Sequence, residues 1–116
     1  MTLESQKQLV EPMEVRVCTV DDLSDGKVIS VLVDDAKSKI MVRKIENQIY
    51  ATSAFCTHKA VDLTKQGIFQ DEYVTCKNHL ATFDMTTGEV IQPPATNPLP
   101  VYPVIVRNNE VFLKVE

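Results

Sequence analysis

The chain is predicted to fold as an all-β protein, an antiparallel β-sandwich or barrel, and three observations support this. Apolar and β-branched residues occur in runs that are too short for helices. Residues that form turns, mainly Asp, Asn, Ser and Gly, separate these runs. Residues 92–103 contain five of the six prolines, which excludes a helix or a central strand there and predicts a stiff loop.

Eight or so short strands are expected from alternation and from short apolar runs. The candidate segments, in chain order, are residues 14–20, 28–33, 40–45, 48–54, 73–75, 82–84, 89–91, 101–107 and 111–115. The run at 28–33 is continuously apolar, which predicts a strand covered on both faces. Residues 21–26, 34–38 and 85–88 are expected to form turns, whereas 59–67 should be a loop with at most one helical turn.

Two of the expected hairpins are predicted by their turn residues. Glu46-Asn47 joins one strand pair, and Asn108-Asn109 joins the last pair; asparagine tolerates the left-handed conformation that a two-residue connection needs.

Length, charge and cysteine count limit the possible classes of protein. A chain of 116 residues has the size of one domain, and residues 1–13 form a polar N-terminal arm of uncertain role. The net charge of -4 argues against nucleic acid as a partner, and no apolar run is long enough to span a membrane. No apolar run of signal-peptide length lies near the N-terminus, so a cytoplasmic location is expected. An odd number of cysteines argues against a disulfide framework.

Both histidines of the chain lie next to cysteines, in two short segments. The first segment is Cys56-Thr57-His58 and the second is Cys76-Lys77-Asn78-His79. Two thiolates and two imidazoles suit a tetrahedral zinc ion, and they equally suit a Rieske [2Fe-2S] centre. Ligand softness does not separate these alternatives, because both metals accept both ligand types.

The arrangement of the ligands favours the iron-sulfur alternative. Zinc fingers usually bring like ligands together on one element, whereas here each segment supplies one cysteine and one histidine. Two loops of this kind could hold a two-iron cluster from opposite sides.

The sequence resembles the Rieske-type [2Fe-2S] ferredoxins, which are soluble electron carriers of oxygenase systems. The resemblance covers residues 14–116, and it rests on Cys56-Thr57-His58, Tyr73 to His79, Thr82-Phe83-Asp84 with Thr87-Gly88, and the prolines from Pro94 to Pro103.

The resemblance implies the Rieske fold with a small inserted cluster-binding subdomain. Its cluster-binding loops would lie at about residues 55–84, beside a proline-rich loop at about 92–103. Cys56 and Cys76 would bind the inner iron, and His58 and His79 the outer one. The implied partners are a ferredoxin reductase and a terminal oxygenase or oxidase.

Two positions depart from the family pattern in ways that concern the loop backbone. The second loop of the family typically reads Cys-Pro-x-His-Gly, and here Lys77 and Leu80 occupy the proline and glycine positions. If the backbone at the glycine position has a positive φ, Leu80 would be strained.

Four other departures concern redox properties. Respiratory Rieske proteins have bridging cysteines at the positions of Val61 and Asn78, and hydroxyl groups at those of Ala81 and Phe83. This chain therefore lacks both the bridge and the hydroxyl donors that stabilise a reduced cluster. A reduction potential towards the low end of the Rieske range, about -150 mV, is expected.

The sequence contains no nucleophile paired with a base and no phosphate loop, so an electron carrier without its own substrate chemistry is expected. A zinc-bound structural or interaction module and a Rieske-like small subunit of a nitrite reductase are the alternatives. Cys18 is expected to be a buried structural thiol, and Asp84 to anchor a turn.

Overall fold

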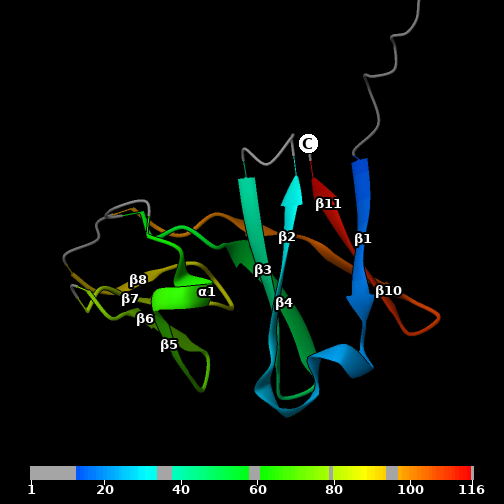
Figure 1. The fold of residues 1–116 in the computed structure, drawn as a ribbon, viewed down its shortest axis with the longest axis horizontal. Helices are drawn as coiled ribbons and strands as arrows, with labels where there is room; N and C mark the ends of the chain where they lie inside the picture. Colours follow the sequence, from blue (N-terminus) through cyan, green and yellow to red (C-terminus); the bar gives the residue numbers. More distant parts are fainter. Residues whose placement is uncertain (1–12, 34–37, 58–60, 79, 94–96, 116) are drawn as a thin grey trace, which may run out of the picture.

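The computed structural model of the chain describes residues 13–33, 38–57, 61–78, 80–93 and 97–115. These residues form three antiparallel sheets, so the predicted all-β class is confirmed (Figure 1). The expected arm lies outside the described residues apart from Met13, and so does the turn at 34–38 apart from Ser38.

The first sheet joins the two ends of the described chain. Its strand order is β1 (Met13–Thr19), β11 (Glu110–Val115) and β10 (Val104–Arg107). Asn108 and Asn109, between β10 and β11, have φ angles of 51° and 68°, as the hairpin prediction requires.

The second sheet has the order β2 (Val28–Val33), β3 (Ser38–Ile45), β4 (Gln48–Ser53) and β9 (Val101–Tyr102). The expectation that residues 28–33 are covered on both faces is wrong, because β2 is an edge strand on which Leu32 is exposed. The doubly covered strand is β3: Ile40 and Val42 face one hydrophobic core, and Met41 faces another. An apolar run indicates a strand but does not identify its place in the sheet.

The predicted turn at 21–26 is also wrong, because Asp21–Gly26 forms a 3-10 helix, η2. Short Asp and Ser side chains serve both conformations, since they bond to nearby backbone groups in either. Here Ser24 Oγ donates to the Asp21 carbonyl at 2.9 Å, and Leu23 is fully buried under the sheets.

The third sheet is a separate meander in the order β5-β6-β7-β8, which lies to one side of the other two sheets in Figure 1. The strands are β5 (Gly67–Gln70), β6 (Tyr73–Cys76), β7 (Thr82–Asp84) and β8 (Val90–Gln92), preceded by the one-turn helix α1 (Leu63–Gln66). It is inserted between β4 and β9, which pair directly with each other (Ala51 with Tyr102). The expected inserted subdomain is therefore present, although β5 itself was not predicted.

One hydrophobic core joins this subdomain to the second sheet. Its buried members are Met41, Ala54, Cys56, Leu63, Val74, Cys76, Ala81, Phe83, Met85 and Leu99. Arg43 of β3 lies at the same junction with its guanidinium 5.4 Å from the centre of the Phe69 ring. Burial lowers the pKa of Arg43 below its ordinary value, with the charge of Asp71 opposing the shift.

Candidate metal centre

The first cysteine of the predicted site ends the strand region that follows β4. Cys56 is buried, with 3% of its surface exposed, and its amide donates to the Val61 carbonyl at 2.9 Å. Just outside this bond, Phe55 and Asp62 form an antiparallel bridge. A short ladder of backbone contacts therefore closes the segment 57–60, which contains His58.

The second cysteine lies at the end of β6 and is closed off in the same way. Cys76 is 1% exposed, and its amide donates to the Ala81 carbonyl at 2.8 Å. Both loops thus share one closure, a cysteine amide bonded to the carbonyl five residues further along. The second closure encloses residues 77–80, which include His79.

The two loops meet at a single core, although their cysteines are 20 positions apart in the sequence. Cys56 and Cys76 belong to the same buried cluster, and both are free thiols rather than disulfide partners. His58 and His79 lie outside the described residues, so their positions remain predictions. Two buried and unbridged thiols in one core are donors that suit a soft metal or an iron-sulfur cluster.

Leu80 has the backbone conformation that was expected to strain it. Its φ is +62°, a left-handed value that glycine adopts freely and leucine adopts at a cost. The Leu80 amide donates to the Cys76 carbonyl at 2.8 Å, so this turn belongs to the closure of the second loop. The Leu80 side chain is 54% exposed, so it does not offset the strain by burial in the core.

The described part of the proline-rich segment lies beside the first loop, as the resemblance implies. Thr57 Oγ1 donates to the Asn97 carbonyl at 2.6 Å, and Leu99 is buried in the core that contains the two cysteines. The Leu99 amide donates to the Gly88 carbonyl at 2.8 Å. Gly88 has φ +83°, and a Cβ atom added there would lie 2.2 Å from the Leu99 carbonyl oxygen, so only glycine fits.

Cys18 and Asp84, two residues assigned structural roles from the sequence, have those roles. Cys18 is buried in the core between the first and second sheets, and burial first, then the charge of Asp22, raises the pKa of its thiol. Asp84 Oδ1 accepts hydrogen bonds from the amide and hydroxyl of Thr86 and so anchors the turn after β7.

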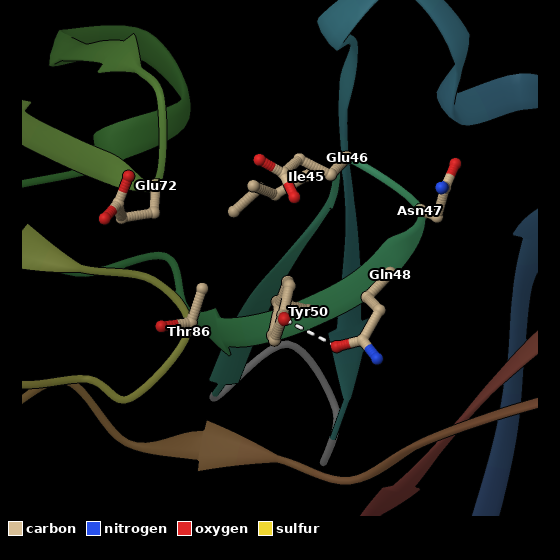
Figure 2. Close-up of a pocket in the computed structure, with 7 residues that line it drawn as sticks. All are labelled: Ile45, Glu46, Asn47, Gln48, Tyr50, Glu72 and Thr86. Atoms are coloured by element: carbon tan, nitrogen blue, oxygen red, sulfur yellow. Dashed lines mark hydrogen bonds between the residues drawn. The ribbon is translucent and has the colours of Figure 1, made fainter.

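A polar hollow of about 380 Å³ lies at the end of the β3–β4 hairpin (Figure 2). Tyr50 Oη donates to Gln48 Oε1 at 2.7 Å on its wall, and Glu72 faces it from the turn after β5. None of the residues that line this hollow is a cysteine or a histidine. It therefore lies apart from the predicted ligands.

Sequence reasoning missed one ion pair at the base of the first loop. Lys39 Nζ lies 2.5 Å from Asp62 Oδ2, and Asp62 Oδ1 accepts from the amide of Thr64 at the start of α1. Burial raises the pKa of Asp62, but the hydrogen bonds from Lys39 and Thr64 together outweigh it, so the net pKa is below its ordinary value. The Asp-x-Thr pattern signals a helix cap, but nothing in the sequence connects it to Lys39.

The structure shows two loops with the same closure, each based at a buried cysteine next to a small β subdomain, and comparison with known proteins identifies the family. The Rieske [2Fe-2S] domain family matches residues 13–103. The ferredoxin component of the naphthalene 1,2-dioxygenase/salicylate 5-hydroxylase systems of Ralstonia sp is 34% identical over 97 residues, covering 84% of this chain and 90% of that protein.

Solved structures agree with this comparison. The ferredoxin of carbazole 1,9a-dioxygenase from Nocardioides aromaticivorans IC177 matches with a TM-score of 0.80 and 30% identity, over 89% of this chain and 98% of its own. A chain in the complex of reduced oxygenase and oxidized ferredoxin in carbazole 1,9a-dioxygenase matches with a TM-score of 0.82 and 27% identity, covering 91% of this chain and 96% of that one.

The chain therefore belongs to the Rieske [2Fe-2S] domain family and is a ferredoxin of that type. A [2Fe-2S] cluster is its cofactor, and the buried thiols of Cys56 and Cys76 fit such a group. In the part of the chain that the structure describes, no helix is long and apolar enough to cross a membrane.

Proposed function

We propose that the chain carries one electron at a time from a reductase to a terminal oxygenase, on a cluster held by Cys56, His58, Cys76 and His79. The observation that carries the proposal is the pair of buried, unbridged cysteines at the bases of two loops with the same backbone closure. The names of the relatives, ferredoxin components of dioxygenase systems, support the choice of partner.

The roles proposed for the two cysteines are supported by their environments. Burial of Cys56 and Cys76 supports assigning them to the iron that faces the protein, since an apolar surrounding excludes water from the thiolate ligands. His58 and His79 then complete the outer iron. The cluster supplies a one-electron couple, and the chain holds its ligands fixed so that little rearrangement accompanies electron transfer.

The rest of the proposal concerns the extent and setting of the carrier. Residues 14–116 form one Rieske domain, because β1 pairs with β11 and ties both ends of the described chain into a single sheet. The chain has no substrate chemistry of its own. A cytoplasmic location is supported by its three cysteines, none of which forms a disulfide.

The reduction potential should lie near the low end of the Rieske range, about -150 mV. Ala81 and Phe83 carry no hydroxyl group, and both are fully buried in the core that contains the cysteines. Substituting Ala81→Ser introduces a hydroxyl in the second loop and should raise the potential. A strongly positive wild-type potential in a redox titration would contradict this assignment.

The electron-transfer role is tested with the purified holoprotein, a flavin-dependent ferredoxin reductase and an aromatic-ring dioxygenase. The ferredoxin should be reduced by the first protein and should support substrate turnover by the second. His79→Ala should abolish both steps, whereas Cys18→Ala should leave both intact. Purification in a stable assembly with a large catalytic subunit would instead favour the nitrite reductase alternative.

A further inference from the structure

Lys39 and Asp62 form the most enclosed ion pair among the described residues. Only 18% of the Lys39 side chain and 20% of the Asp62 side chain are exposed. The pair between Arg107 and Glu14, by comparison, is 51% and 34% exposed. Since solvent screens exposed pairs strongly, Lys39–Asp62 is the pair with the greatest capacity to hold two segments together.

Asp62 lies at the mouth of the first ligand loop. Its backbone forms the bridge to Phe55, directly outside the Cys56–Val61 hydrogen bond. Its side chain caps α1, accepting from the Thr64 amide at 3.0 Å and from the Thr64 hydroxyl at 2.6 Å. The position of Asp62 therefore determines where the returning arm of the loop begins.

Lys39 holds both arms of the same loop from the second sheet. Its carbonyl accepts from the Ala54 amide at 2.8 Å, and its ammonium group binds Asp62 and lies 3.2 Å from Thr64 Oγ1. The Ala54 carbonyl in turn accepts from the Leu63 amide at 2.7 Å. One residue of β3 thus contacts the outgoing arm through its backbone and the returning arm through its side chain.

The second loop is held differently in the described structure. Its hydrogen bonds outside the closure are neutral. The Lys77 amide donates to the Gln66 carbonyl at 2.8 Å, and Gln92 Nε2 and Thr82 Oγ1 donate to the Leu80 carbonyl at 3.2 Å and 3.3 Å. All come from neighbouring segments of the same subdomain. Among the described residues, only the first loop is joined to the second sheet by a charged pair.

We propose that Lys39 and Asp62 are positioning residues that latch the first ligand loop to the second sheet, and that this latch governs how firmly the cluster is retained. The inference rests on the proposed ligands Cys56 and His58. Release of the cluster requires these ligands to separate from it, and the latch restrains both arms of the loop that contains them. The opposite charges of the pair nearly cancel at a distance. The pair should therefore act mainly by restraining the loop and only weakly by shifting the reduction potential of the cluster.

The test measures the rate at which a chelator removes iron from the holoprotein, together with its EPR spectrum and reduction potential. Lys39→Met and Asp62→Asn should each accelerate cluster loss roughly tenfold and should alter the EPR line shape in the same way. Lys39→Arg, which keeps the ion pair, should restore nearly wild-type behaviour. Glu14→Gln, which breaks an exposed pair in the first sheet, should change nothing.

A milder variant covers the case in which Lys39→Met or Asp62→Asn fails to fold. Thr64→Val removes only the hydroxyl bonds to Asp62 and Lys39, and it should accelerate cluster loss roughly threefold. Wild-type rates in all three variants would overturn the latch. A purely electrostatic effect would also contradict the proposal. It would leave the rate of cluster loss unchanged, lower the reduction potential in Lys39→Met and raise it in Asp62→Asn.

The latch and the proposed ligand set fail in distinguishable ways. If the wild-type holoprotein shows no Rieske-type EPR signal, both the ligand proposal and the latch proposal are wrong. If the wild-type signal is present and the variants match the wild type, only the latch is wrong.

Discussion

The two ligand loops share a closure but differ in what holds them in place. In each, a buried cysteine amide donates to the carbonyl five residues further along. The first loop is also joined to β3 through Lys39 and to the proline-rich segment through Thr57 and Asn97. The second is held by its own subdomain and by a left-handed residue, Leu80.

This difference shows that one metal centre can combine two ways of positioning ligands. The first loop depends on contacts between residues far apart in the sequence, such as Lys39 with Asp62. The second depends on local backbone geometry, with strain at Leu80 that the surrounding hydrogen bonds must offset. Substitutions should therefore affect the first loop from a distance and the second loop locally.

The largest expected effect is the same for both loops. Cys56→Ser and Cys76→Ser should each abolish the visible absorption of the cluster, because each removes one thiolate of the proposed ligand set from the shared core. Cys18→Ser is the matched control, since Cys18 is equally buried but lies in the other core. Retention of a normal cluster after either loop substitution would contradict the ligand assignment.

The next effect tests the support that the proline-rich segment gives to the first loop. Gly88→Ala should lower the free energy of unfolding by about 3 kcal/mol, since the new Cβ atom would lie 2.2 Å from the Leu99 carbonyl oxygen. Gly26→Ala is the control: Gly26 has φ +72° but open space around it, so a loss of about 1 kcal/mol is expected. Chemical denaturation measures both values. Equal losses would show that the left-handed backbone strain, and not the contact with the Leu99 carbonyl, determines the loss of stability.

The ion pair at the first loop should make the stability of the protein depend on pH. The pKa of Asp62 is lower in the folded protein than in the unfolded chain, so its ion pair stabilises the fold above about pH 4 and the stabilisation is lost as pH falls through the folded-state pKa. The difference in unfolding free energy between wild type and Asp62→Asn should be about 1 kcal/mol at pH 6. It should shrink as pH falls towards 3.5, and a difference that is constant over this range would contradict the role of Lys39.

The smallest effect concerns the second loop. Leu80→Gly should stabilise the protein by about 0.5–1 kcal/mol, because glycine relieves the left-handed strain and loses little packing at an exposed position. Leu80→Ala keeps the strain and should change stability by less than about 0.5 kcal/mol. A destabilised glycine variant would show that the leucine side chain supports the loop.

Much of this arrangement could be predicted from sequence because it depends on local chemistry. The hairpin at Asn108-Asn109 follows from its turn residues, whereas the inserted subdomain and the strain at Leu80 are implied by the resemblance to the Rieske-type ferredoxins. The position of each strand within its sheet could not be predicted from its composition. Strand β2 is apolar yet lies at an edge, whereas β3, which contains Arg43 and Lys44, lies between two cores.

The contacts that sequence reasoning missed connect distant segments. Lys39 and Asp62 are 23 positions apart, and neither has a neighbouring pattern that identifies its partner. Strand β5 was missed because Gly67–Gln70 is short and begins with glycine, which is unfavourable in isolated strands. Pairing with β6 supplies the stabilisation that its own sequence lacks.

EPR spectroscopy of the purified, reduced wild-type protein tests the central claim most directly. The account predicts a red-brown protein with a Rieske-type signal and with magnetic coupling to the nitrogen atoms of two imidazole ligands. A colourless, EPR-silent protein that contains zinc would contradict it. So would a [2Fe-2S] signal without nitrogen coupling, because the two loops would then not hold the cluster through His58 and His79.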